Sequence, residues 1–423
     1  MCKSNVQNNV LTKTTKYAMI FQNYNDVQKW IRERVMKQQL VDKFLEMYGD
    51  GDDVDVYFAP GRVNLIGEHT DYNGGHVFPC AITIGTYAVA RRRTDDSVRL
   101  YSLNYPENGM IQASLRDLAY RKKDGWANYP KGVLQTFISK GCQIPYGVEI
   151  LYYGEIPKGL GIGSSASLGV VTGLILKELM ELKDINMVDI ALFTQLAENE
   201  YIGAGSGIMD PFTIAMGKKN HAIFLDTSDL SYIYAPLLLP HEKIIITNSQ
   251  KSRLAVDERY QERRAQCEQA LKELQRVVAI RDLGELTAEV FEQVQEMIES
   301  PIRLKRARHA VTENQRTIQA VEALERGDIE EFGQLMNASH LSLKEDYEVS
   351  CEELDILVEE SWDIEGVLGS RMMGAGFGGC MISIVKNSAV NEFINHVGEH
   401  YKERTGLVAE FYVVETGNGA AKI

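Results

Sequence analysis

The stretch GRVNLIGEHTDYNGG at residues 61–75 gathers an arginine, two carboxylates, a histidine, a tyrosine and two asparagines beside apolar sequence. It follows VDVYFAP and precedes HVFPCAITIGTYAVARRR, and both flanks are rich in β-branched and aromatic residues. Such flanks predict two strands, the second antiparallel to the first, with the polar stretch as the end of the first strand and the loop that leaves it. A metal, a phosphate or a sugar would each explain this density of hydrogen-bonding groups.

The composition indicates a globular protein of two or three domains, since 423 residues are present, 44% of them hydrophobic, and a domain commonly holds ~150 residues. The formal net charge of -14 opposes binding to nucleic acid or anionic membrane, because both depend on excess Lys and Arg. The six cysteines form no CxxC pair. The N-terminus has no apolar core of signal-peptide length, and the longest apolar run is far shorter than the ~20 residues of a membrane span. We therefore expect a reduced, cytoplasmic protein without nucleic-acid or membrane partners.

Hydrophobic periodicity along the rest of the chain predicts the class α+β, because the strands come in hairpin-like groups instead of alternating singly with helices. A domain boundary is expected near residues 225–245. Helical spacing occurs at residues 25–49, 164–182, 187–203, 257–338 and 389–406, and strand-like composition at residues 146–157, 220–230, 243–249, 378–386 and 407–415.

The sequence PKGLGIGSSAS at residues 157–167 joins a predicted strand to a predicted helix. Its glycines remove Cβ atoms, so the backbone can approach a ligand closely, and the helix that starts near Ser164 or Ser165 offers free N–H groups and a positive dipole end to an anion. A tight turn capped by Ser164 is the structural alternative. The GxxxxGK[ST], HRD and DFG patterns are absent, so the loop is a phosphate-site candidate of another kind.

The sequence GAGFGG at residues 374–379 formally matches the dinucleotide pattern GxGxxG. Its glycines precede a predicted strand and no helix opens after them, which is inconsistent with a Rossmann site. We expect either a simple strand-entry turn or a glycine wall packed against a ligand.

The sequence GSGIMDPF at residues 205–212 places Asp210 before Pro211. Proline disfavours the α conformation in the preceding residue and fits the first turn of a helix, so Asp210 is predicted as an N-cap. The functional alternative is a carboxylate held at a helix start, where it orients or deprotonates a hydroxyl group.

Taken together, these motifs resemble the GHMP kinase superfamily in order and spacing, and the galactokinase family within it. GRVNLIGEHTDYNGG is similar to the galactokinase signature at nearly every position, PKGLGIGSSAS to the phosphate loop, GIMDPF to the catalytic segment and GSRMMGAGFGGC to the third motif. RYQERRAQCE and SLKEDYEVSCEELD also resemble galactokinase segments, so the resemblance runs from about residue 50 to the end. It implies a two-domain GHMP kinase fold, with an N-terminal mixed-sheet α+β domain at 15–235 and a C-terminal ferredoxin-like α+β domain at 236–423.

The resemblance implies a monomeric, ATP-dependent sugar 1-kinase that transfers the γ-phosphoryl group of ATP to the anomeric C1 hydroxyl of D-galactose, giving galactose 1-phosphate, with ATP and Mg²⁺ as cofactors. One alternative is a kinase for a related sugar, N-acetylgalactosamine or L-arabinose. Another is a non-catalytic sugar- and ATP-binding sensor, which would have no need to retain Arg62, Ser164, Glu198 and Asp210 together.

The same resemblance assigns roles to individual residues. It implies that Asp210 faces the anomeric hydroxyl, as a general base or only to orient it, and that Arg62 stabilises the charge of Asp210 and of the transferring phosphoryl group. A metal held by the adjacent Glu68 and His69 competes with the sugar assignment, but neighbouring side chains point apart on a strand. The implied sugar contacts are Glu68, His69, Asp71 and Tyr260; the implied phosphate-loop contacts are Gly159, Gly161, Gly163, Ser164, Ser165 and Ala166; and the implied Mg²⁺ ligands are Ser164 and Glu198.

The chain departs from the galactokinase pattern at three places. Pro211 stands where glutamine is typical, Ile162-Gly163 where leucine-serine is typical, and Gly169 where glutamate is common. Proline has neither an amide side chain nor a backbone N–H, and a glycine inside a helix costs ~1 kcal/mol relative to alanine. Because Ser164 is retained, we expect these departures to affect sugar preference more than ATP binding.

Overall fold

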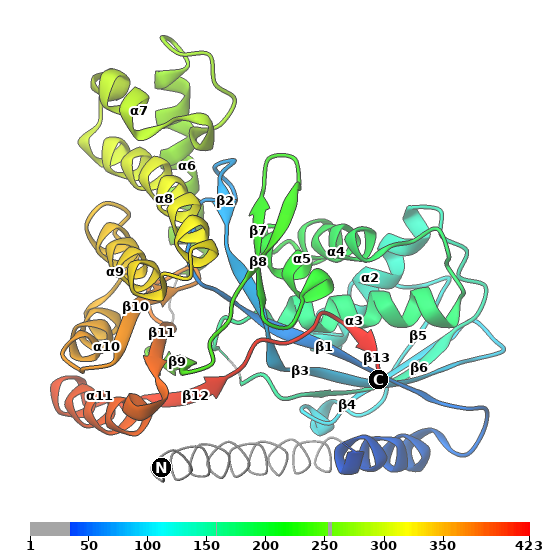
Figure 1. Cartoon of the computed structure of the whole chain (residues 1–423). Coiled ribbons are helices and arrows are strands. Elements are labelled where there is room, and N and C mark those ends of the chain that lie inside the picture. Colours follow the sequence, from blue (N-terminus) through cyan, green and yellow to red (C-terminus); the bar gives the residue numbers. More distant parts are fainter. Residues whose placement is uncertain (1–33, 158, 253–255) are drawn as a thin grey trace, which may run out of the picture.

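The structure is a computed structural model that describes residues 34–157, 159–252 and 256–423 (Figure 1). Part of the helix predicted at 25–49 therefore lies outside the described residues. Residues 34–48 are helical, and the helix ends at Gly49, whose positive φ of 81° is accessible to glycine. Its Leu40 and Phe44 are buried in one cluster with sheet residues, so this helix covers one face of the first sheet.

The first sheet is mixed, as predicted, with six strands in the order β13-β1-β3-β6-β4-β5. β1 and β3 are antiparallel, which confirms the prediction for the flanks of the opening stretch, whereas β4 and β6 are parallel. Its strands are β1 (Asp55–Asn64), β3 (Pro79–Arg92), β4 (Ser97–Ser102), β5 (Ile111–Ser114), β6 (Val148–Gly154) and β13 (Ala421–Lys422).

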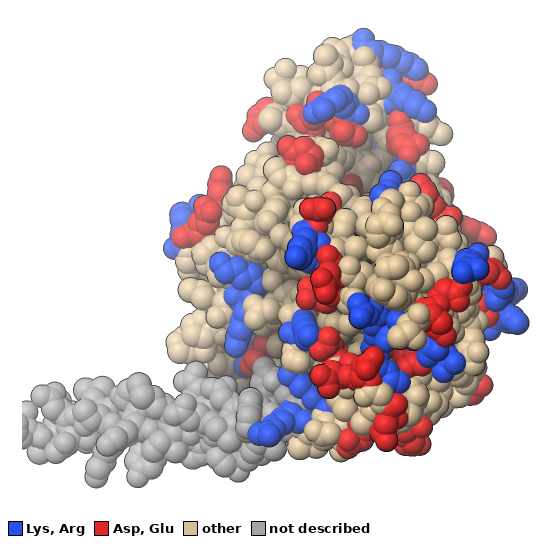
Figure 2. Space-filling model, turned by 90° about the vertical axis from the view of Figure 1, so that its right-hand side faces the viewer, with Lys and Arg blue, Asp and Glu red and all other residues tan. Residues whose placement is uncertain are grey.

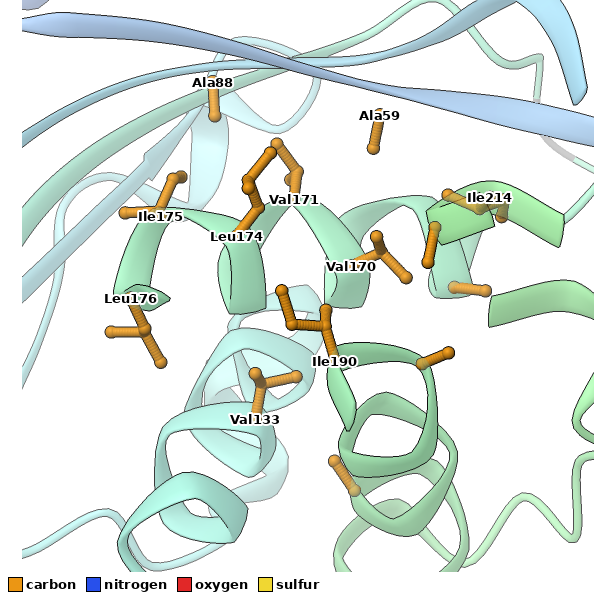
Figure 3. Close-up of a cluster of buried hydrophobic side chains, with 14 of the residues drawn as sticks. Ala59, Ala88, Val133, Val170, Val171, Leu174, Ile175, Leu176, Ile190 and Ile214 are labelled. Carbon is orange, nitrogen blue, oxygen red and sulfur yellow. The ribbon is translucent and has the colours of Figure 1, made fainter. Parts of the chain in front are cut away.

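Helix α3 (Ser164–Leu179) packs against the other face of this sheet. Helices α2 (Asn128–Ser139) and α4 (Met187–Leu196) cover the side of α3 that faces away from the sheet (Figure 3). Ala59 and Ala88 point from the strands toward α3 in this view, and Val133 and Ile190 face it from the opposite side. A Cβ on Gly169 would lie 2.5 Å from the Thr194 side chain, so this departure from the family pattern permits close helix packing. The other neighbouring helical elements are the π-helical turn η3 (Ala197–Ile202) and α5 (Met209–Met216).

The second half of the chain forms a ferredoxin-like domain, as predicted. Its antiparallel sheet has the order β10-β11-β9-β12, and the first and third connections in sequence are helical. The elements are β9 (Glu242–Asn248), α6 (Val256–Leu274), α7 (Ala288–Val294), α8 (Pro301–Glu325), α9 (Ile329–Glu345), α10 (Glu352–Trp362), β10 (Val367–Met373), β11 (Cys380–Lys386), α11 (Val390–Thr405) and β12 (Glu410–Val414).

The remaining elements are small. β2 (His76–Val77), β7 (His221–Asp226) and β8 (Tyr232–Pro236) form a three-stranded sheet, and short 3-10 turns lie at η1 (Pro106–Asn108), η2 (Lys122–Ala127), η4 (Leu283–Glu285), η5 (Gln295–Met297) and η6 (Asn387–Ala389).

Both faces of the ferredoxin-like sheet are buried. Along β9, Ile245 packs with α10 and α11, whereas Ile244 and Ile246 join a cluster that includes Val63 and Ile82 of the first sheet. Alternating side chains of one strand therefore hold two different layers together. This explains the three consecutive isoleucines at residues 244–246 in a strand of an antiparallel sheet.

The end of the chain returns to the first sheet. Thr416 bridges to Ile82 of β3, and β13 pairs with Tyr57 and Phe58 of β1. The domain boundary expected at 235/236 stays a prediction. Residues 421–422 nevertheless belong to the sheet of the N-terminal domain, because β13 pairs with β1.

The described surface carries mixed charges. Figure 2 shows acidic and basic side chains interspersed over one face, without a continuous basic patch among the described residues in that view. Among the described helices, none has both the length and the apolar character needed to cross a bilayer.

We predict that Gly333→Ala in α9 lowers the stability although alanine is the better helix former. A Cβ at this position would lie 2.1 Å from the backbone oxygen of Leu368 in β10, so helix and strand would have to separate. We expect a loss of roughly 1–3 kcal/mol in the free energy of unfolding, measured by denaturant titration.

Gly398→Ala in α11 is the matched control. Its new methyl group would meet only the ring edge of Phe411, at 3.3 Å, and a ring can shift slightly. Equal destabilisation by the two substitutions would show that α9 does not depend on this backbone contact.

Candidate active site

A bidentate ion pair between Arg62 and Asp210 lies at the centre of the site. Arg62 Nε donates to Asp210 Oδ1 at 2.8 Å, and Arg62 Nη2 donates to Oδ2 at 2.7 Å. Beside the arginine, β3 bulges opposite Gly61, because β1 advances two residues from Pro60 to Arg62 while β3 advances four, from Gly85 to Ala81. A Cβ at Gly61 would lie 2.9 Å from the backbone oxygen of Ile162, so this position needs glycine. The fold thus joins two residues predicted as catalytic.

Asp210 occupies the first turn of α5, so its prediction as an N-cap is wrong. The helix begins at Met209 and its N-cap is Ile208. Pro211 is then the third helical residue, where a backbone N–H has no partner within the helix in any case. Proline consequently removes no helical hydrogen bond and leaves Asp210 in place.

The glycine-rich loop lies beside this pair. Gly159, Gly161 and Gly163 all have positive φ, and Arg62 Nη1 donates to the Gly161 carbonyl at 2.6 Å. Helix α3 begins at Ser164, as predicted, but its N-cap is Gly163, so the alternative of a turn capped by Ser164 is wrong. Among the residues that the structure describes, no side chain caps the first N–H groups of α3. This end of the helix is therefore built for an anion.

Glu198 lies close to the loop, in the π-helical turn η3. Its side chain is buried and its Oε1 has no hydrogen-bond partner among the described residues. Burial raises the pKa of the Glu198 carboxyl, the hydroxyl of Ser165 opposes the rise, and the charge of Asp210 adds to it. Ser165 and Glu198 line the same small cavity, which makes Ser165 a candidate ligand partner beside the predicted Ser164.

The turn after β1 presents the predicted sugar residues. β1 ends at Asn64, so Glu68 and His69 lie in a turn and not on a strand, and the strand argument against a metal does not apply. Within the described part of the chain, neither residue belongs to a group of side chains that could hold a metal ion. His69 has a φ of 61°, a left-handed conformation that is rare outside glycine and is held by the surrounding packing.

Glu68 forms a buried ion pair with a residue that sequence reasoning missed. Arg371 of β10 donates from Nη2 to Glu68 Oε2 at 2.6 Å and from Nη1 to the Asn64 carbonyl at 2.7 Å. Arg371 is fully buried. The arginine stands inside the quoted motif GSRMMGAGFGGC, but nothing in the sequence indicates its partner.

Glu313 of α8, also missed, supports the backbone of the same turn. Its Oε1 accepts hydrogen bonds from the N–H groups of Gly67 and Glu68, at 3.0 and 3.1 Å, and from the Ser339 hydroxyl at 2.6 Å. Burial alone would raise the pKa of Glu313, but the positive charges around it, Arg316 first, lower that pKa to about 2. The carboxylate is therefore ionised and acts as a fixed acceptor.

His69 is neutral and has one nitrogen free for a ligand. Burial, with a contribution from Arg371, lowers its pKa to about 3. Its Nδ1 lies 2.7 Å from the Tyr72 hydroxyl, which in turn lies 2.7 Å from the Tyr347 hydroxyl. Its Nε2 is buried without a hydrogen-bond partner among the described residues, although the backbone at Ala375 in the glycine-rich hairpin approaches the ring.

The GAGFGG sequence is the hairpin between β10 and β11, and no helix follows it, as predicted. A Cβ on Gly376 would lie 2.2 Å from the backbone oxygen of Val349, so the hairpin lies directly against the segment after α9. Arg259 of α6 stacks over the Phe377 ring, 3.7 Å from its centroid. With Ala375 close to His69, the hairpin forms one wall beside the site.

Asp71 is a half-buried carboxylate that lies near two other acidic side chains, Glu68 and Asp210. Burial raises its pKa to about 7, and repulsion from Glu68 and Asp210 contributes. The ring of Tyr260 lies 5.6 Å from that of His69, and Asp71 and Tyr260 line one cavity of about 390 Å³. Polar side chains of Gln195, Asn199, Ser206 and Arg264 complete its lining.

A second cavity, of about 230 Å³, opens at the N-terminus of α3. Ser164 and Ser165 form its end, and its walls are aromatic, from Tyr105, Trp126, Tyr129 and Tyr152. A larger hollow of about 530 Å³, lined mainly by residues 237–244 and 414–416, contains none of the predicted site residues.

Three family models match segments of the chain. The galactokinase galactose-binding signature matches residues 42–92, the N-terminal domain of GHMP kinases residues 128–218, and the GHMP kinase C-terminal region residues 320–403.

The chain is similar to whole proteins as well. A galactokinase from Fusobacterium nucleatum subsp. nucleatum is 51% identical over 92% of this chain and 100% of its own. The crystal structure of Lactococcus lactis galactokinase complexed with galactose matches with a TM-score of 0.89 at 44% identity, over 92% of this chain and 100% of that one. Mevalonate kinase from Methanococcus jannaschii shares the fold, with a TM-score of 0.60 at 19% identity over 87% and 99% of the two chains.

We predict that Asp71→Asn stabilises the ligand-free protein more at high pH than at low pH. Burial raises the pKa of Asp71 from 3.8 to about 7, so the folded chain holds this proton more tightly than the unfolded chain does. The resulting stabilisation is present below the unfolded pKa and is lost as the pH rises through the folded pKa. The free energy of unfolding of the variant minus that of the parent should grow by roughly 1–3 kcal/mol between about pH 4 and 8.

Asp229→Asn is the control, because a backbone hydrogen bond from Ser231 lowers the pKa of this exposed carboxyl. The variant-minus-parent difference should then change with pH in the opposite direction. Parallel pH profiles for the two variants would contradict the assignment for Asp71.

Proposed function

The chain belongs to the galactokinase family of the GHMP kinases, and on that basis we propose that it transfers the γ-phosphoryl group of ATP to the C1 hydroxyl of D-galactose at the Arg62–Asp210 pair. The observation that carries this proposal is the position of the pair beside the uncapped N-terminus of α3. A carboxylate suited to a hydroxyl group thus lies next to an anion site, as phosphoryl transfer requires.

On the sugar side, we propose that the turn after β1 binds galactose. His69 Nε2, buried without a partner among the described residues, is suited to a sugar hydroxyl, and a buried polar atom of this kind costs free energy until it is paired. Asp71 and Glu68 supply carboxylate acceptors, and Tyr260 closes one wall. Arg371 holds Glu68 in a single orientation.

On the nucleotide side, we propose that the phosphates lie at Gly159, Gly161, Gly163, Ser164, Ser165 and Ala166, and that the adenine base enters the adjoining aromatic cavity. Trp126 and Tyr105 offer faces on which a base can stack. Mg²⁺ fits the neighbouring donor set, because Glu198 Oε1 is a buried carboxylate oxygen without a partner among the described residues and Ser164 and Ser165 supply hydroxyl oxygens. When bound, the ion would neutralise charge on the ATP phosphates.

The proposed reaction uses the chain's own groups as follows. Asp210 accepts a hydrogen bond from the C1 hydroxyl and takes its proton as that oxygen bonds to the γ-phosphorus of ATP, while the bond from this phosphorus to the bridging oxygen breaks and ADP leaves with the electron pair. Arg62 keeps Asp210 aligned through two hydrogen bonds and places positive charge beside the transferring group. We propose that the enzyme acts as a monomer in the cytoplasm, since all of these groups come from one chain and ATP is its phosphoryl donor.

The first test is sugar-dependent ADP release with Mg-ATP, comparing galactose, N-acetylgalactosamine, L-arabinose, glucose and no sugar. We expect release with galactose far above that with glucose, because a site built around one set of hydroxyls leaves polar groups unpaired with another. Asp210→Asn should lower kcat about 10²- to 10⁴-fold in a variant that still folds, as shown by a cooperative thermal unfolding transition.

The exposed Asp229→Asn is the matched control and should keep parental turnover. Turnover with another sugar and not galactose would reject the substrate, and near-normal kcat in Asp210→Asn would reject the role of the carboxylate.

A second prediction concerns the base. Trp126→Ala should raise KM for ATP about 5- to 50-fold, because stacking on an aromatic ring contributes roughly 1–3 kcal/mol per base. KM for galactose should change less than about twofold. Tyr120→Ala, which removes an exposed aromatic ring outside the cavity, is the control in the same steady-state assay. If Trp126→Ala changed KM for ATP and KM for galactose equally, the adenine base would not stack on Trp126.

A further inference from the structure

Three side chains on α10 and α11 direct metal-binding atoms toward one point. Glu360 comes from α10, and His396 and His400 stand four residues apart on α11, so both imidazoles lie on one helix face. Their ligand atoms all lie within 4.8 Å of one another, and this is the one such group in the part of the chain that the structure describes. In Figure 1, α10 and α11 lie on the far side of the ferredoxin-like sheet from α3 and α5.

The two imidazoles converge on one carboxylate oxygen. His400 Nδ1 lies 2.7 Å from Glu360 Oε2, and His396 Nε2 lies 3.4 Å from the same oxygen. The two imidazole rings lie edge to face with centroids 4.0 Å apart. His396 Nε2 is buried yet makes no hydrogen bond to any described residue, so one nitrogen of the group lacks an aligned partner.

The surroundings orient the carboxylate and leave the group accessible. Arg404 Nη1 donates to Glu360 Oε1 at 2.7 Å, and Arg404 Nη2 lies 3.5 Å from Glu359 Oε2. The arginine therefore fixes one oxygen of Glu360 and leaves the other facing the histidines, as supporting residues do in metal sites. The His396 and His400 side chains keep 32% and 43% exposure, so an ion and water can reach them.

We propose that Glu360, His396 and His400 bind a divalent transition-metal ion of the zinc type and clamp α10 to α11. Two imidazoles and one carboxylate are a zinc-type ligand set, which Mg²⁺ and Ca²⁺ disfavour because they prefer oxygen ligands. Water completes the coordination at the exposed side. Nitrogen and oxygen ligands bind zinc at ~2.0–2.2 Å, so the ion replaces the direct contacts of Glu360 Oε2 with the imidazoles. The proposed catalytic residues take no part, and the inference is independent of the proposed function.

The test is equilibrium Zn²⁺ binding to the metal-free full chain at about pH 7.5, in competition with a chromophoric chelator. We expect the parent to bind one more equivalent than the double variant His396→Gln/His400→Gln, or to bind it more than about tenfold more tightly. The exposed His241→Gln is the matched control and should bind as the parent does. Thermal unfolding with and without Zn²⁺ should show a higher Tm with the ion only in the parent and the control.

A single His400→Gln variant, whose parent side chain is more exposed, covers the case in which the double variant fails to fold. Co²⁺ absorption distinguishes this group from the cysteines, since nitrogen and oxygen ligands give no thiolate charge-transfer band. Equal Zn²⁺ binding by parent and variants, or a cobalt spectrum with thiolate bands only, would overturn the proposal and leave Glu360 as a hydrogen-bonded partner of two histidines.

Discussion

The buried ion pair between Glu68 and Arg371 connects the two halves of the protein at the turn that follows β1. Taking two charges out of water costs several kcal/mol per ion, and only short, well-aligned contacts offset that cost. Here the arginine also binds the Asn64 carbonyl, and Glu313 fixes the N–H groups at Gly67 and Glu68. The turn therefore acquires its conformation from β10 and α8, which lie more than two hundred residues later in sequence. Neither half can form the site without the other.

The centre of the site is short of positive charge. Glu68, Asp71, Glu198 and Asp210 converge there, and burial raises the pKa values of Asp71 and Glu198. Arg62 and Arg371 are each committed to one carboxylate. The packing around the site therefore holds acidic groups in an arrangement that is unfavourable in the empty protein. Hydroxyl donors and a cation are the ligands that would relieve it.

The sequence was sufficient for the features that depend on neighbouring residues. The antiparallel pair β1–β3, the helix after the glycine-rich loop and the ferredoxin-like half follow from local periodicity and from motif resemblance. Arg371 and Glu313 could not be paired with the turn that follows β1, because their partners are distant in sequence. One signal was available: Arg306, His309, Glu313 and Thr317 repeat at helical spacing and are all buried, which marks a polar face turned inward. The start of α5 was misplaced by two residues because proline fits several first-turn positions equally well.

The return of the chain to its first sheet has a consequence for synthesis. β1 pairs with β13, and Ile423 donates its backbone N–H to Val56, so residues 421–423 close this edge of the sheet. Until those residues have been synthesised, the nascent chain carries an open β1 edge, and exposed strand edges are templates for wrong pairing. The two-residue strand β13 thus covers the sheet edge of the N-terminal domain, most of which is synthesised some two hundred residues earlier. An extension fused directly after Ile423 would begin at that sheet edge, beside Val56.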